Sequence, residues 1–342
     1  MDEVNPPAFV GSDPLNKPES GVALGSEPRQ CLLSYPLMTG QISPLMQDII
    51  RPRWQIVLLL MLIALTFGSN HVSARVAFDH GTSVMLAVVV RSAFTAFALL
   101  LALKFEGVAL HLPEGLGLKL LATGVLLTIQ SLCIYSSVSI IPVGLALLTF
   151  NTFPFIFALM SWAIEGRRPS NRTLLFMPVA LLGLSLALNL YGISAQTDAA
   201  VMLRGIILAL AAAVAFATVM MVTQRWLVVI DSRVRSLCMM SIIVVLMGGI
   251  GLVQDGFALP HDHTGWIALA CLCVLYAIAI ISFFVFMPRF GMLDNAAVMN
   301  FEPVAALLMG YLILDQAISP VQIVGVFVVL TAMVGFAVQK RT

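Results

Sequence analysis

A carboxylate and a guanidinium each interrupt a long apolar segment of this sequence. Glu302 lies in NFEPVAALLMGYL, directly before Pro303, and Arg91 lies in the second apolar segment. An ionised side chain in a bilayer costs about 2.5–3.5 kcal/mol on insertion scales unless it is paired, hydrated or protonated. We therefore expect Glu302 to be a substrate or proton site, or else one member of a structural ion pair. Arg91 could pair with Glu302 or snorkel toward the membrane surface.

If Glu302 is a proton site, the arrival of substrate could make it release its proton. This would couple transport to protons.

Two asparagines each precede a proline by three residues inside an apolar segment: Asn151 before Pro154, and Asn300 before Pro303. A proline lacks a backbone donor and frees a carbonyl, which needs another partner in lipid. We expect a kinked helix at each proline, with the asparagine satisfying the freed carbonyl or bridging to a neighbouring helix. Direct contact between the asparagines and a substrate is the alternative.

Five further polar side chains lie in apolar surroundings: Asn70, His71, Gln130, Tyr135 and Tyr276. Taken singly, each is more often an interhelical hydrogen bond than a ligand. The HDH stretch at residues 261–263 is short and falls in a link between apolar segments, so it is interpreted as a solvated loop. We predict no metal site, no cofactor and no catalytic residue.

The composition identifies a membrane protein. Of 342 residues, 60% are hydrophobic and only 10% are charged, and the mean hydropathy is +1.01. The net charge of +1 argues against nucleic acid as a partner, because phosphates require a basic surface. Residues 1–50 contain many Pro, Gly, Ser and acidic residues and no periodic apolar face. They are predicted to form a disordered tail, although a start site placed too early would look the same.

Ten apolar segments are long enough to cross about 30 Å of hydrocarbon as helices. They are Trp54–Phe78, Ser83–Phe105, Leu116–Ile140, Val143–Ile164, Leu174–Tyr191, Val201–Gln224, Val234–Val253, Trp266–Met287, Ala296–Leu314 and Val321–Val338. With the N-terminus inside, most Lys and Arg residues fall in the inner links, whereas the outer links hold only Arg204 and Arg75. The positive-inside rule therefore predicts that both termini are cytoplasmic.

An internal repeat relates the two halves of the chain. An offset of 149 residues carries Asn151 to Asn300 and Pro154 to Pro303. Both residue types are rare in apolar helices, so residues 54–191 and 201–338 are predicted to be two similar five-helix units. Because five is odd, the second unit enters the membrane inverted, as in many secondary transporters. The fold class is thus an all-α polytopic membrane protein built from two inverted repeats, with a central site between them.

The sequence resembles the drug/metabolite transporter superfamily, and within it the ten-helix EamA group. The resemblance is carried by FEPVAALLMGYLILDQAIS (301–319), FPFIFALMSWAIEGRRPS (153–170) and Arg91, and it extends over residues 54–338. The Gly-Glu pair usual in the family is replaced here by Gly166-Arg167 and by Asp315-Gln316.

This resemblance implies a carrier that moves a small organic metabolite or drug by alternating access, as an exporter in a bacterial inner membrane. It also implies that the helices bearing His71, Gln130, Tyr135 and Tyr276 line a central cavity. A channel-like permease and a membrane-embedded enzyme are the alternatives, but the sequence has neither charge rings nor an HExxH motif. The expected partners are the lipid bilayer, a small-molecule substrate and protons. The protein is expected to be a monomer or a homodimer.

Overall fold

The computed structural model describes residues 53–108, 110–166, 179, 182–183, 186, 198–290, 302–315 and 319–337. The tail predicted for residues 1–50, most of the fifth predicted span and Asn300 lie outside this part of the chain. All regular structure in the described residues is helical, which agrees with the predicted fold class.

The helices follow the apolar segments, because a helix satisfies its own backbone donors and acceptors inside a bilayer. They are α1 (Arg53–Asp79), α2 (Val84–Phe105), α3 (Gly117–Ile140), α4 (Val143–Phe150), α5 (Phe153–Glu165), α7 (Ala199–Val222), α8 (Ser232–Val253), α9 (His263–Phe290), α11 (Glu302–Leu314) and α12 (Pro320–Ala337), with a π-helical turn, η2 (Thr223–Leu227), after α7.

Within the described part of the chain, seven helical segments are long and apolar enough to cross a membrane. They are Leu58–Asp79, Val84–Phe105, Gly117–Ile140, Val143–Ile164, Ala199–Leu227, Ser232–Val253 and His263–Ser282. They correspond to seven of the ten predicted spans. Two shorter apolar helical segments, Ala305–Leu314 and Pro320–Ala332, lie where the ninth and tenth spans were expected. The number ten therefore stays a prediction.

The fourth predicted span is broken near its middle. α4 ends at Phe150 and α5 begins at Phe153, with Pro154 at the second position of α5. Between them, the Asn151 side chain donates to the Leu147 carbonyl at 2.8 Å, and the Thr152 hydroxyl donates to the Thr149 carbonyl at 2.8 Å. The proline thus starts a new helix, and polar side chains satisfy the backbone at the break.

The 149-residue offset of the sequence also relates the helices of the structure. α5 and α11 both contain 13 residues, and the offset carries both bounds of α5 onto those of α11. Each helix is followed by a residue in the left-handed region: Gly166, with φ of 69°, and Asp315, with φ of 49°. The two-repeat architecture fits this correspondence.

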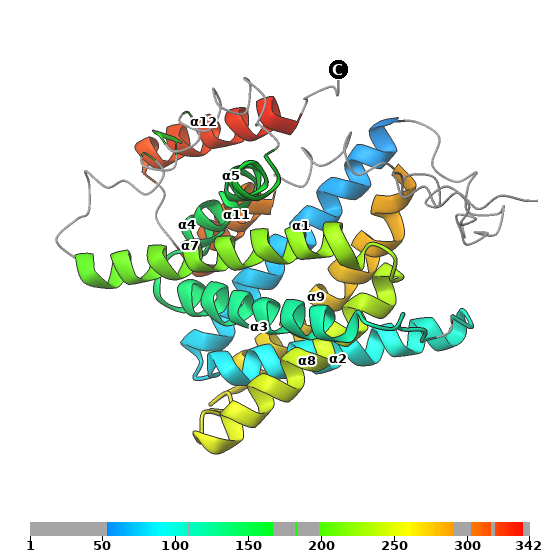
Figure 1. The fold of residues 1–342 in the computed structure, drawn as a ribbon. Coiled ribbons are helices and arrows are strands. Elements are labelled where there is room, and N and C mark those ends of the chain that lie inside the picture. The colour runs from blue at the N-terminus through cyan, green and yellow to red at the C-terminus, as the bar shows by residue number, and fades with distance from the viewer. Residues whose placement is uncertain are drawn as a thin grey trace, which may run out of the picture. The chain divides into compact units, whose positions relative to one another are not determined.

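Helix packing follows the same relation. The most extensive contacts join α3 to α7, α1 to α9 and α2 to α8, and Figure 1 shows α3 beside α7 and α2 beside α8. Under the offset, α1 corresponds to α7, α2 to α8 and α3 to α9. The α3–α7 contact is therefore the counterpart of the α1–α9 contact, and the α2–α8 contact is its own counterpart.

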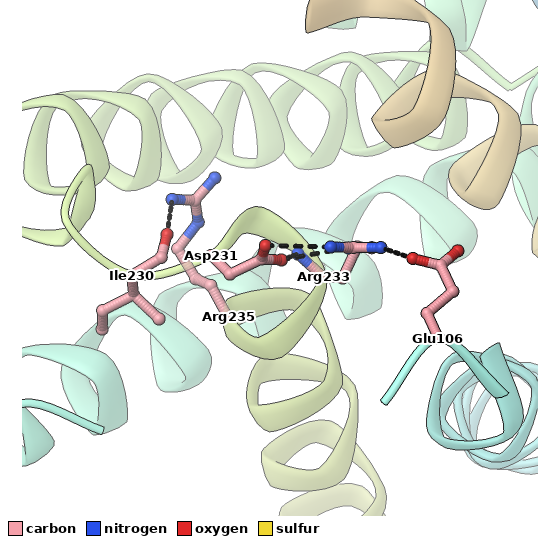
Figure 2. A network of polar contacts seen from close by, with 5 residues as sticks. All are labelled: Glu106, Ile230, Asp231, Arg233 and Arg235. Carbon is pink, nitrogen blue, oxygen red and sulfur yellow. Dashed lines mark hydrogen bonds and ion pairs between the residues drawn. The ribbon is translucent and has the colours of Figure 1, made fainter. Parts of the chain in front are cut away.

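A cluster of charged side chains, which we call the Arg233 tie, joins the end of α2 to the start of α8 (Figure 2). Arg233 contacts Glu106, which follows α2, and donates to Asp231 from Nε at 3.2 Å and from Nη2 at 3.1 Å. Partial burial works against ionisation of Asp231, but the hydrogen bonds from Arg233 outweigh it and lower the Asp231 pKa. Arg235 donates to the carbonyls of Leu227 and Ile230, which fixes the turn before α8.

A second cluster, the His80 tie, joins the opposite ends of the same two helices. His80 lies between α1 and α2, and its Nδ1 is 2.8 Å from Asp262 Oδ2. The hydrogen bond from the Gly265 backbone and the contact with His80 hold the pKa of Asp262 below its usual range. Ser83 N donates to the Ala258 carbonyl at 3.1 Å. The α2–α8 pair is thus fastened at both ends.

Candidate functional site

A group of polar side chains lies among α1, α2, α3, α9 and α11, and we call it the central cluster. It consists of Asn70, His71, Arg91, Ser131, Tyr135, Tyr276 and Glu302. Arg91, on α2, is 2% exposed. Its guanidinium carbon lies 3.8 Å from the ring centroid of Tyr276 and 4.8 Å from that of Tyr135. Three predicted site residues from three helices therefore meet at one place.

Arg91 is only partly compensated by its surroundings. Moving a cation out of water costs several kcal/mol even after relaxation. Each ring contact returns about 2 kcal/mol when both groups are desolvated, and Nη2 donates to Ser131 Oγ at 3.3 Å. The Nε atom is buried and has no hydrogen-bond partner in the part of the chain that the structure describes. This guanidinium therefore retains the capacity to bind a further acceptor.

Tyr135, on α3, connects the two sides of the central cluster. Its hydroxyl accepts a 3.0 Å hydrogen bond from Asn70 Nδ2, and its ring centroid lies 5.2 Å from that of His71. Asn70 and His71 are consecutive on α1. Phe67, one turn earlier, meets the Tyr276 ring edge to face at 6.3 Å between centroids. These contacts bind α1 to α3 and α9 around Arg91.

Glu302 contacts His71, with 3.7 Å between Oε1 and Nε2. It lies in the first turn of α11, where the partial positive charge of the helix N-terminus favours a carboxylate. The sequence left open a pair between Glu302 and Arg91, but the structure gives Glu302 a histidine partner and Arg91 two tyrosine rings. The position of each residue along its helix could not distinguish these two arrangements, because it does not give the rotation of the helix about its own axis.

Gly68 permits the close approach of α1 and α11. A Cβ atom at this position would lie 3.0 Å from the backbone nitrogen of Ala306 and 3.1 Å from the carbonyl oxygen of Glu302. Both neighbours are backbone atoms that cannot rotate away. The absence of a side chain at Gly68 therefore sets the spacing at which His71 can reach Glu302.

Several buried polar atoms in and beside the central cluster have no hydrogen-bond partner among the described residues. They are Asn70 Oδ1, His71 Nδ1, Arg91 Nε and Ser92 Oγ. Buried polar atoms in native proteins are nearly always paired, with protein or with another bound molecule. Donors and acceptors left together in this way are suited to a polar ligand.

The remaining predicted residues have other surroundings. Gln130 lies at the edge of the cluster, where Oε1 is 3.5 Å from Ser131 Oγ. The Asn151 side chain donates to the Leu147 carbonyl, which is not the Phe150 carbonyl that Pro154 leaves free, so the role predicted for Asn151 stays a prediction. Pro303 is the second residue of α11, as Pro154 is of α5.

Sequence reasoning did not single out Ser131 as a site residue. It lies four residues before Tyr135, on the same face of α3, and this helical spacing was the available signal.

Two cavities lie elsewhere in the described structure. One of about 180 Å³ is bounded by residues of α1, α9 and α11, and one of about 560 Å³ lies among α2, α3 and α8. Neither is lined by a residue of the central cluster.

Comparison with known proteins bears on both halves of the chain. A model of the EamA-like transporter family matches it twice, over residues 54–189 and 203–338. A search of curated proteins gives no match. One solved structure, titled only "Crystal structure of protein", is 17% identical with a TM-score of 0.58, and the match covers 83% of this chain and 96% of the other. At this identity the likeness shows the fold.

Proposed function

The chain belongs to the EamA-like transporter family, and from this premise we propose that it is a secondary carrier of a small organic molecule. In this proposal the molecule binds at the central cluster and crosses a bacterial inner membrane by alternating access.

The observation that carries the proposal is the composition of the central cluster. Asn70, His71, Arg91 and Tyr135 come from the first matched segment, and Tyr276 and Glu302 come from the second. Carriers built from repeats bind their substrates between the repeats, near the midplane of the bilayer. Partnerless polar atoms at such a place suit a substrate that binds there.

Alternating access requires that the two halves exchange conformations. We propose that residues 54–191 and 201–338 are inverted repeats, with both termini in the cytoplasm. The counterpart contacts α3–α7 and α1–α9 support this arrangement. The break between α4 and α5 is the proposed hinge, because the regular helix is interrupted between Phe150 and Phe153.

Glu302 and His71 form the proposed proton site. The two groups lie 3.7 Å apart, so a proton can reside on either of them, and its uptake from or release to solution changes the charge of the site. Outward movement of the substrate is the proposed direction, driven by its concentration in the cell.

A screen followed by a matched pair of variants tests this function. Cells that overproduce the protein are compared with empty-vector cells for resistance or growth on a panel of metabolites and drugs, and a responding compound is then measured in membrane vesicles. Tyr135→Phe removes the acceptor of the Asn70 hydrogen bond, which contributes about 0.5–1.5 kcal/mol. We expect transport to fall about two- to twelvefold.

Tyr311→Phe is the control, because Tyr311 is an exposed tyrosine on α11. It should transport like the wild type. Equal behaviour of overproducing and empty-vector cells toward the whole panel contradicts the carrier function. Unchanged transport by a well-folded Tyr135→Phe variant places the substrate elsewhere.

A further inference from the structure

The charges around the central cluster do not balance. The helices that supply it or contact α11 are α1, α2, α3, α4, α9 and α11, and within their described bounds the acidic residues are Asp79 and Glu302. Asp79 pairs with Arg75 at the end of α1, with 3.0 Å between Oδ2 and Nε. Glu302 contacts His71. No acid in these helices is left for Arg91.

The His71–Glu302 pair has the same net charge in both of its protonated forms. With one proton on the pair, it is either imidazolium with carboxylate or imidazole with carboxylic acid, and each form is neutral. Arg91 then gives the cluster a charge of +1. When the proton leaves, the pair becomes −1, and the cluster as a whole becomes neutral.

Other titratable groups near the pair do not alter this count. Tyr135 and Cys133 lie on α3, and Tyr276 and Cys273 lie on α9; phenols and thiols ordinarily carry no charge at physiological pH. α4 has the sequence VGLALLTF and carries no titratable side chain. On α11, the other titratable side chain is the exposed Tyr311. Arg75 is neutralised by Asp79.

We propose that the central cluster binds a small organic acid as its monocarboxylate, together with one proton. The carboxylate accepts from the unpaired Nε of Arg91, and the proton comes from solution and is held by His71 and Glu302. The loaded site and the empty, deprotonated site are then both neutral, so each can be buried in the bilayer. The inference rests on the proposed carrier function and adds its substrate class and its stoichiometry.

The geometry favours a singly charged carboxylate over anions that carry two or more charges. A single guanidinium with one unpaired buried donor, and aromatic rings at 3.8 and 4.8 Å, offers one positive charge in apolar surroundings. A dianion would leave one charge uncompensated in a buried place, which is costly. Asn70 and Ser131, bonded to Tyr135 and Arg91, supply polar contacts for a substituent such as a hydroxyl group.

In this proposal a proton is taken up when the substrate binds, whereas the sequence suggested that a proton is released. The sequence suggested that an acid balanced between burial and a nearby Arg91 could release its proton as substrate arrives. Glu302 contacts His71, so in this proposal the arriving anion supplies the negative charge that balances Arg91, and the proton neutralises the His71–Glu302 pair. The proton therefore binds with the anion, and the two cross the membrane together without net charge movement.

Calorimetry on the purified full-length protein in detergent tests the proposal. The probes are potassium lactate and potassium phenylacetate, each compared with its neutral amide, lactamide or phenylacetamide. We expect at least one acid to bind and its amide to bind at least tenfold more weakly. Titration in two buffers with different ionisation enthalpies should show one proton taken up per anion. The affinity should rise about tenfold for each unit that the pH falls, over the range where the empty site is deprotonated.

Two substitutions separate the roles of the charges. Glu302→Gln keeps the pair neutral without a proton, so the acid should bind with no proton uptake and no pH dependence. Arg91→Gln should abolish binding of the acid, and Arg91→Lys should restore part of it. Glu114→Gln and Arg204→Gln are exposed controls and should behave like the wild type.

The outcomes separate this inference from the carrier function. The proposal that the ligand is a carboxylate is overturned if acid and amide bind with equal affinity. It is also overturned if the Arg91→Gln variant binds the acid as tightly as the wild type. If the wild-type protein binds the acid without taking up a proton, the proposed coupling of anion binding to proton binding is overturned. If no acid binds while the metabolite screen finds a transported cation or neutral compound, the substrate class is wrong and the carrier function stands. If neither experiment finds a ligand, both proposals fail.

Discussion

At the scale of single residues, the central cluster depends on one glycine as much as on its polar side chains. Gly68 lies one turn before His71 on α1, against the first turn of α11. The His71–Glu302 distance of 3.7 Å is therefore set by a backbone crossing that no side chain widens.

Gly68→Ala should separate α1 from α11 near Glu302. The added methyl group meets backbone atoms at 3.0–3.1 Å, and overpacking of this kind costs about 1–3 kcal/mol. We expect a lower unfolding temperature in detergent and a weaker pH dependence of transport. Gly248→Ala is the matched control, because a Cβ at Gly248 meets nothing within 4 Å. Equal behaviour of the two variants would show that the crossing tolerates a side chain.

The sequence identified the residues of the cluster better than their contacts. Arg91, His71, Tyr135, Tyr276 and Glu302 stood out because polar groups in apolar segments are costly and need partners. Which partners they find depends on helix rotation and on tertiary crossings, such as the one at Gly68. Neither follows from spacing along a single helix, and so the sequence could not choose between Arg91 and His71 as the partner of Glu302.

At the scale of the helices, the break between α4 and α5 differs from the kink that Pro154 predicted. A proline within a helix bends it, whereas here the chain leaves α4 at Asn151 and begins α5 two residues later. The sequence indicated the place of the disturbance. The hydrogen bonds of Asn151 and Thr152 made the difference, because local side-chain bonding competes with continuation of the helix.

Replacement of either proline by alanine should slow the exchange between inward and outward states. The new N–H can extend the helix backwards by one hydrogen bond, which contributes about 0.5–1.5 kcal/mol to the straight form. We expect a two- to twelvefold slower transport rate in Pro154→Ala and in Pro303→Ala, with near-normal expression. Pro320→Ala, at the exposed first position of α12, is the control. Wild-type rates in both variants would mean that the prolines are incidental to movement.

At the scale of the whole molecule, the internal repeat found in the sequence also relates features of the structure that the sequence did not show. The rare Asn and Pro residues gave the strongest indication of the 149-residue offset, and the same offset relates the bounds of α5 and α11 and the conformations of Gly166 and Asp315. The two ties at the ends of α2 and α8 were not predicted, because they depend on which loops the fold brings together.

Reporter fusions should show both ends of the chain on the cytoplasmic side. This expectation comes from the distribution of Lys and Arg among the links. A fusion after Val338 should give a cytoplasmic signal, and one within residues 254–264, in the link between α8 and α9, should give a periplasmic signal. A cytoplasmic signal from the second fusion would contradict the proposed orientation.

The matched helix contacts also bear on the energy difference between the two end states of the carrier. If the α3–α7 contact loosens as its counterpart α1–α9 tightens, the gain and the loss nearly cancel. The unloaded protein would then populate the inward-facing and outward-facing states almost equally. The direction of transport would follow the concentration gradient of the substrate across the membrane. A change that strengthens one contact by about 1.4 kcal/mol would shift the populations tenfold. One substitution at either contact would thus give a carrier that rests mainly in one state and accepts substrate mainly from one side of the membrane.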